Sequence, residues 1–300
     1  MVTVDLITGF LGAGKTTFLR HYIPYLKSKG ETLHIIENEF ADCGIDSFLL
    51  HSEEDDCCEI SDLSGMCMCC IGKREFIHLL LSAAQNGITR IIVEPSGIYD
   101  VDEFFDVLSD PRVSQCCEIG CIISIVDPLL SAELSEEAKY LTFSQLLASG
   151  TVIFSKTQLI SENQLQVARD RINQLLSEKG CDSGLPGEVC TKPWDQLTES
   201  DFEDFMDSSY FRMVHDRESF EHSFIFQSKE IRLRDCTNKE DLRNRIQSLF
   251  TSPVSGRVFR VKGFASTADG KQYEVNATGS LISIEESKVQ ADTLVVIGQR

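Results

Sequence analysis

Short apolar runs alternate with amphipathic segments along the first two thirds of the chain. The apolar runs are rich in β-branched residues and nearly continuous, a pattern typical of strands buried on both faces of a parallel sheet. Strands are predicted over residues 2–8, 33–36, 89–93, 119–126 and 151–154. Amphipathic helices are predicted over residues 17–29, 74–86, 133–148 and 162–179. This alternation predicts an α/β fold with a doubly wound, mostly parallel sheet.

The composition changes after Lys179, where Gly, Pro and Ser become frequent, and an acidic helical piece follows near residues 199–207. We therefore expect a first domain over residues 1–207, a linker over 208–220 and a smaller α+β domain over 221–300. In the second domain a helix is predicted over 239–250. Its predicted strands cover 221–227, 256–265, 272–278, 281–285 and 293–297.

The first predicted strand leads directly into Gly-Phe-Leu-Gly-Ala-Gly-Lys-Thr at residues 9–16, which matches G-x-x-x-x-G-K-[ST] at every fixed position. Glycines let successive backbone N–H groups point at phosphate oxygens, and the helix that follows adds its positive N-terminal end. Lys15 is expected to reach the β- and γ-phosphates, and the Thr16 hydroxyl to bind Mg²⁺. The sequence therefore predicts a P-loop NTPase. The predicted nucleotide-binding residues in this loop are Gly12, Ala13, Gly14, Lys15, Thr16 and Thr17.

Carboxylates follow two other predicted strands, at the sheet edge where open α/β sheets bind ligands. Glu94 ends the strand over 89–93 and is predicted to serve the Mg²⁺ side of the site. Glu37 and Glu39 follow the strand over 33–36. Their spacing leaves open whether they act on Mg²⁺, on the attacking water or on a second metal, or simply belong to a solvated loop. With Lys15, these three carboxylates are the catalytic candidates.

Residues 65–70, Gly-Met-Cys-Met-Cys-Cys, bring three thiols into four positions. Thiolates suit soft or borderline cations such as Zn²⁺ and, less readily, Co²⁺. Cys67, Cys69 and Cys70 are therefore predicted metal ligands, with a redox-inert cysteine cluster as the alternative. A fourth ligand would have to come from elsewhere in the chain or from solvent.

The chain carries a formal net charge of −19 and has a sequence pI near 4.7. This charge argues against nucleic acid or an anionic membrane as the main partner. No apolar run reaches the length of a membrane span, and the chain opens with a strand rather than a signal peptide. Twelve cysteines beside a P-loop indicate a reducing compartment. We expect a cytoplasmic protein.

Several motifs in order resemble the CobW-type branch of P-loop GTPases, whose wider relatives include the nickel chaperones of urease and hydrogenase. Beyond the P-loop they are Glu-Asn-Glu-Phe at 37–40, Cys-x-Cys-Cys at 67–70, Glu-x-[ST]-Gly at 94–97, [NS]-Lys-x-x-Leu at 155–159 and Arg-Val-Lys-Gly at 260–263. The resemblance implies slow GTP hydrolysis coupled to the delivery of zinc or cobalt to a client metalloprotein. It also implies that Glu37 and Glu39 lie in a nucleotide-sensing switch, and it leaves a nucleotide-dependent homodimer open.

Two departures from the family pattern bear on the site. The guanine-reading Asn-Lys-x-Asp is here Ser-Lys-Thr-Gln, so Lys156 and Gln158 occupy the base-binding positions. A Gln amide offers one acceptor oxygen where an Asp carboxylate accepts two hydrogen bonds from guanine, so guanine selectivity is expected to be weaker. Met66 stands where the family has a glycine directly before the first cysteine, which is expected to shift the turn and to weaken or retune the metal site.

Two other functions are compatible with these motifs. The first is a nucleotide-dependent regulator or assembly factor that uses the thiols only as a structural zinc site. The second is a small-molecule kinase, which would leave the thiol cluster and the second domain unexplained. The leading hypothesis is a metallochaperone that uses GTP, Mg²⁺ and zinc or cobalt.

Overall fold

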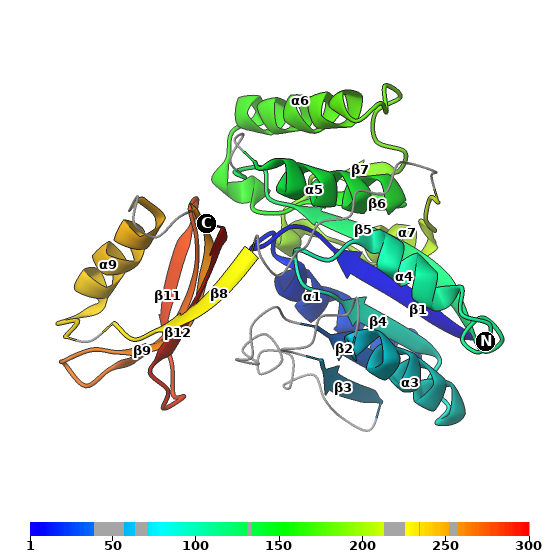
Figure 1. Cartoon of the computed structure of the whole chain (residues 1–300), viewed down its shortest axis with the longest axis horizontal. Helices are drawn as coiled ribbons and strands as arrows, with labels where there is room; N and C mark the ends of the chain where they lie inside the picture. The colour runs from blue at the N-terminus through cyan, green and yellow to red at the C-terminus, as the bar shows by residue number, and fades with distance from the viewer. Residues whose placement is uncertain are drawn as a thin grey trace. The chain divides into compact units, whose positions relative to one another are not determined.

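The computed structural model describes residues 1–38, 57–63, 71–130, 134–212, 226–233, 235–251 and 257–299. Contacts within the chain divide it into two compact units, Met1–Glu218 and Ser219–Arg300 (Figure 1). This division falls inside the segment predicted as a linker, residues 208–220. The exact domain boundaries stay predictions.

A parallel sheet forms the centre of the first unit. Within the described residues its strands lie in the order β3-β2-β4-β1-β5-β6-β7, and every neighbouring pair is parallel. The strands are β1 Val2–Thr8, β2 Leu33–Glu37, β3 Cys58–Asp62, β4 Arg90–Glu94, β5 Cys117–Val126, β6 Thr151–Phe154 and β7 Glu188–Cys190. The predicted doubly wound α/β fold is confirmed.

Helices cover both faces of this sheet (Figure 1). They are α1 Lys15–Ser28, α3 Ile71–Gln85, α4 Val101–Leu108, α5 Glu136–Ala148, α6 Glu162–Glu178 and α7 Glu199–Asp207. One core joins α1 and α7 to the sheet and includes Ile92, whereas the core beneath α3 and α4 includes Ile91 and Val93. Successive side chains of a strand point to opposite faces, so the apolar run of β4 serves both cores. A further core joins α5 and α6 to β6.

Polar side chains set the starts of two of these helices. Ser135 accepts a hydrogen bond from the Ala138 N–H, so α5 begins at Glu136 rather than at the predicted residue 133. Ser161 and Gln164 form a reciprocal capping box at the start of α6, where the prediction agrees with the structure. Local hydrogen bonding, rather than the apolar pattern, therefore fixes these boundaries.

The sequence analysis missed strand β3. None of the predicted strands covers these residues, yet Cys58–Asp62 pairs in parallel with β2. β3 lies at the edge of the sheet, and its five residues Cys-Glu-Ile-Ser-Asp are mostly polar. An edge strand needs little apolar surface, so its pattern resembles that of a loop.

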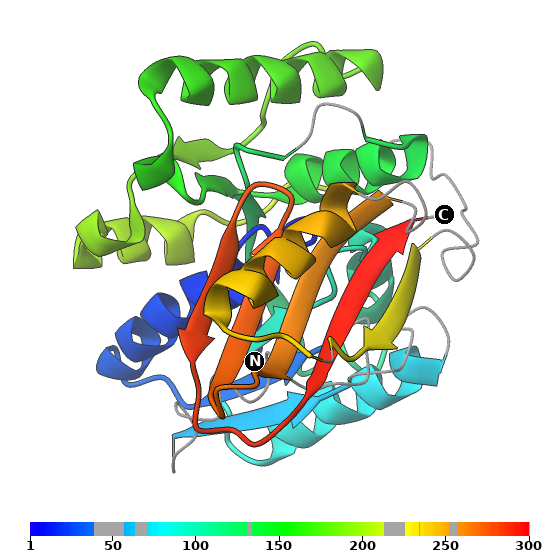
Figure 2. The ribbon, with the colours of Figure 1, turned by 90° about the vertical axis from the view of Figure 1, so that its left-hand side faces the viewer.

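The second unit contains an antiparallel sheet with α9, Lys239–Thr251, across one face (Figure 2). The strands in the described part of this unit lie in the order β11-β10-β9-β12-β8. They are β8 Phe226–Ile231, β9 Arg257–Ser266, β10 Gln272–Thr278, β11 Ile282–Glu286 and β12 Thr293–Gln299. Leu242 and Ile246 of α9 share a core with Val261 and Val275. The predicted smaller α+β architecture is confirmed, and most element ends agree within one or two residues.

None of the described helices combines the length and the apolar character that a membrane span requires.

Candidate functional site

The P-loop connects β1 to α1 at the carboxyl edge of the parallel sheet. Gly9 follows β1 with φ +140°, and a Cβ at this position would lie 2.2 Å from the Ile125 carbonyl oxygen. Only glycine fits such a close approach to β5. Gly14 directly precedes α1, so the backbone N–H groups of the first helical turn face the loop. The local sequence therefore builds an anion-binding turn where the motif predicted one.

Lys15 and Thr16, the first two residues of α1, are both buried. The Lys15 ammonium donates a hydrogen bond to the Gly9 carbonyl oxygen at 3.0 Å, so the side chain folds back over its own loop. The Thr16 hydroxyl donates to a carboxylate oxygen of Glu94 at 2.8 Å. Ala13 is buried beside them, and Thr17 is exposed in the first turn of α1. The fold thus brings together Thr16 and Glu94, which are 78 residues apart in the chain.

The ends of β2, β3 and β4 are joined through Asn38. Its backbone N–H donates to the Glu94 carbonyl oxygen at 2.9 Å, and its side-chain amide donates to the Leu63 carbonyl oxygen at 2.8 Å. The Leu63 N–H donates in turn to the Glu37 carbonyl oxygen at 2.8 Å. Glu37 is itself buried, with 4% of its surface exposed, and stands opposite Glu94 in the β2–β4 register. The predicted carboxylates Glu37 and Glu94 therefore end neighbouring strands.

Gly97 brings the segment after β4 against the P-loop. A Cβ at Gly97 would lie 2.4 Å from the Leu11 backbone nitrogen. The glycine of the predicted Glu-x-[ST]-Gly motif is therefore required by close packing of two backbones. This contact keeps Glu94 and the P-loop in a fixed relation.

The loop over residues 155–159 follows β6 and carries the two predicted base-binding residues, Lys156 and Gln158. We call it the base-side loop. The Lys156 ammonium donates to an Asp127 carboxylate oxygen at 2.6 Å and to the Gly12 carbonyl oxygen at 3.1 Å. Gln158 lies in the short 3₁₀ turn η2, Thr157–Leu159, and is exposed. The structure thus connects Lys156 directly to the P-loop and leaves the Gln158 side chain accessible.

Asp127 is a residue of this site that the sequence analysis did not select. It ends the buried strand β5 and precedes Pro128, which is the same signal that singled out Glu94 after β4. Its importance depends on a partner 29 residues later, which the local pattern does not reveal.

Four predicted site residues, Glu39, Cys67, Cys69 and Cys70, lie outside the described residues. Within the described ranges no group of three or more His, Cys, Asp and Glu side chains could hold a metal ion. No disulfide joins two of the described cysteines. The thiol cluster of residues 67–70 therefore stays a prediction.

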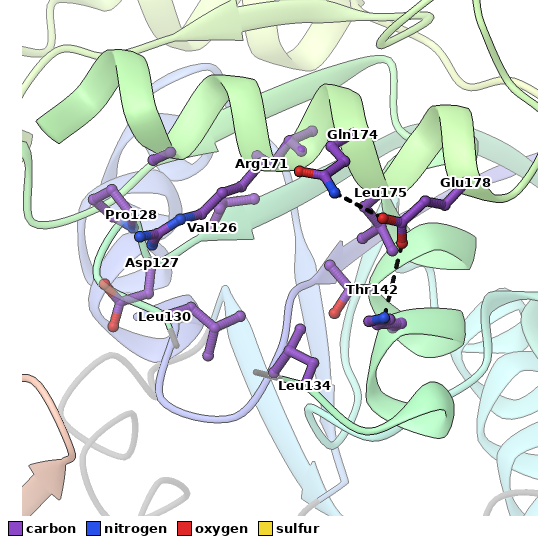
Figure 3. Close-up of a pocket in the computed structure, with 13 residues that line it drawn as sticks. Val126, Asp127, Pro128, Leu130, Leu134, Thr142, Arg171, Gln174, Leu175 and Glu178 are labelled. Carbon is purple, nitrogen blue, oxygen red and sulfur yellow. Dashed lines mark hydrogen bonds and ion pairs between the residues drawn. The ribbon is translucent and has the colours of Figure 1, made fainter. Parts of the chain in front are cut away.

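A separate cavity of about 290 Å³ lies between α5 and α6 (Figure 3). Its walls combine apolar side chains such as Leu130 and Leu175 with Arg171 and Glu178. It contains none of the predicted nucleotide or metal residues, although Asp127 lines it. The cavity is therefore distinct from the P-loop site and adjoins it through this one carboxylate.

Comparisons with known proteins agree with this geometry. The nucleotide-binding domain of the CobW/HypB/UreG family matches residues 3–181, and the C-terminal domain of the cobalamin synthesis protein CobW matches residues 226–300. The zinc chaperone CobW of Pseudomonas aeruginosa is 33% identical over a match covering 41% of this chain and 35% of that protein. The zinc chaperone YeiR of Escherichia coli is 30% identical, over 52% of this chain and 47% of that protein.

A relative in Saccharomyces cerevisiae, the zinc-regulated GTPase metalloprotein activator 1, is 25% identical over 95% of this chain and 71% of that protein. By contrast, the chain spans less than half the length of the two bacterial relatives. The P-loop geometry and the match over residues 3–181 together establish that the chain belongs to the CobW/HypB/UreG family.

Proposed function

We propose that the protein is a GTP-hydrolysing metallochaperone that carries zinc on Cys67, Cys69 and Cys70 to a client metalloprotein. Its P-loop, family membership and zinc-chaperone relatives support this function. The observation that carries the proposal is the position of Asn38. This residue joins the strand end that bears Glu94 to Leu63, just before the segment that contains the thiols.

The nucleotide would lie on the P-loop. Backbone N–H groups at the start of α1 would hold the phosphates, and Lys15 would turn from the Gly9 carbonyl to the β- and γ-phosphate oxygens. Thr16 and Glu94 offer two buried oxygen atoms 2.8 Å apart, and oxygen ligands of this kind suit Mg²⁺. When bound, Mg²⁺ would neutralise charge on the phosphates. Lys156 and Gln158 would face the base.

Proximity makes coupling between nucleotide and metal physically reasonable. Four peptide units separate Leu63 from Cys67, which limits the distance between them to about 14 Å. Glu37 and Asn38 begin the segment predicted to sense the nucleotide. A γ-phosphate that orders this segment would change the affinity of the thiols for zinc. By linkage, zinc would change the affinity for GTP by the same factor.

The test is a zinc titration against a competing chelator, with GDP and with a non-hydrolysable GTP analogue. We expect the two zinc affinities to differ by about tenfold or more, within the usual range of coupling between sites. The triple variant Cys67→Ser, Cys69→Ser, Cys70→Ser should lose zinc binding while it still binds GDP. Cys57→Ser is the matched control, because Cys57 is an exposed thiol outside the motif.

Equal zinc affinity with both nucleotides would contradict the chaperone function and favour a structural zinc site. A Cys57→Ser variant that loses zinc as fully as the triple variant would contradict the assignment of the ligands. Release of GDP that requires an added small-molecule acceptor would instead indicate a kinase.

A further inference from the structure

The carboxyl ends of β1, β5 and β6 meet at one ion pair. The Lys156 ammonium lies 2.6 Å from an oxygen of Asp127, and the two side chains are only 13% and 6% exposed. The same ammonium donates to the Gly12 carbonyl oxygen in the P-loop at 3.1 Å. Each of the three residues comes from the end of a different strand or from the loop that follows it.

Asp127 is fixed through both of its carboxylate oxygens. Oδ2 accepts from Lys156, and Oδ1 accepts from the Leu129 backbone N–H at 2.9 Å. The Ser155 N–H donates to the Val126 carbonyl oxygen at 2.9 Å, which holds the end of β6 beside Asp127. The carboxylate is therefore a rigid acceptor rather than a mobile surface group.

Lys156 has a backbone conformation that also indicates a constrained position. Its φ of 55° lies in the left-handed region, which is uncommon for a residue with a side chain and persists only where the surroundings enforce it. Lysine has three rotatable N–H donors on a flexible stem, so its ammonium needs fixed acceptors to keep one position. Asp127 and Gly12 supply such acceptors.

We propose that Asp127 is a positioning residue for nucleotide binding: it holds Lys156 against Gly12, so that the base-side loop and the P-loop bind nucleotide as one preorganised unit. This inference rests on the proposed function, because it requires a nucleotide on the P-loop. Asp127 acts through Lys156 and contacts no base itself. Loss of the carboxylate should weaken binding of every nucleotide that uses both loops.

The presence of Gln at position 158 determines how the positioning role of Asp127 should depend on the base. Because the usual Asp of the base-reading motif is absent, we expect weak base discrimination at this position and a larger share of the base-side interaction for Lys156. Positioning of Lys156 should therefore matter equally for different bases. We expect the loss of Asp127 to change GDP and ADP affinity by the same factor.

The test measures GDP and ADP dissociation constants by calorimetry for the full chain and for Asp127→Asn. Asparagine retains one oxygen that can accept from Leu129, and it replaces the charged oxygen that faces Lys156 by an amide NH2, which cannot accept. We expect both dissociation constants to rise by about tenfold, the effect of losing one charge-assisted hydrogen bond. In a Lys156→Met background the same change should have no further effect, because the group that Asp127 positions is already gone.

Asp5→Asn is the matched control. Asp5 forms an ion pair with Arg90 at the same 2.6 Å separation, deeper in the same sheet and away from the P-loop. This variant should lower the thermal midpoint and leave the GDP dissociation constant of the folded protein unchanged. A similar loss of GDP affinity in Asp5→Asn would overturn the inference, because general destabilisation would then explain both variants.

Other outcomes separate the two proposals. A wild-type chain that binds no nucleotide would defeat the proposed function itself. Normal GDP binding by both wild type and Asp127→Asn, or an undiminished effect of Asp127→Asn in the Lys156→Met background, would defeat only the positioning role. Should Asp127→Asn not fold, Asp127→Glu replaces it. The displaced carboxylate should weaken GDP binding about threefold, as expected for a hydrogen bond that is distorted rather than lost, and unchanged binding would again contradict the inference.

Discussion

Two ion pairs in the described part of the parallel sheet have the same 2.6 Å separation and different surroundings. Asp127–Lys156 lies at the carboxyl edge, where Lys156 also contacts the P-loop. In the other pair, Asp5 lies within β1 and Arg90 begins β4. Arg90 also pairs with Glu31, and Asp5 accepts from the Cys121 N–H. These contacts involve the body of the sheet rather than the P-loop.

We expect the position of a buried ion pair in the sheet, rather than the interaction itself, to decide its role. Asp5 is completely buried, and burial raises the pKa of its carboxyl, while the neighbouring Arg90 guanidinium acts in the opposite direction. A Cβ at Gly120 would lie 2.3 Å from an oxygen of Asp5, so the absence of a side chain at residue 120 leaves space for this carboxylate. We therefore expect the Asp5 pair to contribute to stability and the Asp127 pair to contribute to nucleotide binding.

The largest expected effect comes from removing the side chain of Lys15, the P-loop lysine at the carboxyl ends of the parallel strands. Lys15→Ala eliminates the ammonium expected to contact the β- and γ-phosphates. Two charged contacts are lost, so GTP affinity should fall by about 4 kcal/mol, or roughly a thousandfold. Calorimetry measures the affinity, with circular dichroism as the check on folding. Lys192→Ala is the control, because Lys192 is half exposed and pairs with Asp201 instead. Full GTP affinity in Lys15→Ala would contradict the P-loop assignment.

A smaller effect, on stability rather than affinity, should follow from Asp5→Asn. This change leaves Arg90 buried with Glu31 as its remaining acidic partner in the described structure. Breaking a buried ion pair from one side should lower the free energy of unfolding by about 3 kcal/mol. Denaturant unfolding of the chain measures the loss. A change below about 0.5 kcal/mol, the range of ordinary surface substitutions, would show that the pair is not structural.

Gln158→Asp should increase the selectivity of the nucleotide site for guanine over adenine. A carboxylate would accept both guanine donors, N1–H and the exocyclic amine, where the amide offers one acceptor. The ratio of GDP to ADP affinity should increase about tenfold. Gln158→Asn is the control, because it has the length of Asp and keeps an amide. An equal increase in both variants would mean that side-chain length, rather than charge, sets base selectivity.

The smallest effect is a pH dependence at Cys117, the first residue of β5. Burial raises the pKa of its thiol to about 12 from the usual 9.0. A raised pKa means that this thiol supports stability below pH 9 and that the contribution is lost as pH rises from about 9 towards 12. At pH 9.5 the loss should be less than about 1 kcal/mol. The decrease in thermal midpoint from pH 8 to pH 9.5 should therefore be larger for wild type than for Cys117→Ala. Equal decreases in the thermal midpoints of the two proteins would contradict the raised pKa of the Cys117 thiol.

Several features could be predicted because their causes are local. Glycine spacing fixes the P-loop, and continuous apolar runs fix the buried parallel strands. The start of α5 was missed because the cap at Ser135, rather than the apolar pattern, sets it. Strand β3 was missed because an edge strand of five mostly polar residues carries little pattern.

The sequence by itself determined the nucleotide-binding loop, the doubly wound sheet and the family, since each rests on short local patterns that follow one another along the chain. Only the tertiary structure decided that Thr16 meets Glu94, that Lys156 meets Asp127 and Gly12, and that Asn38 joins Glu94 to Leu63. These pairs are separated by 25 to 144 residues. They form because the order of strands in the sheet sets which strand ends are neighbours, and no local pattern encodes that order.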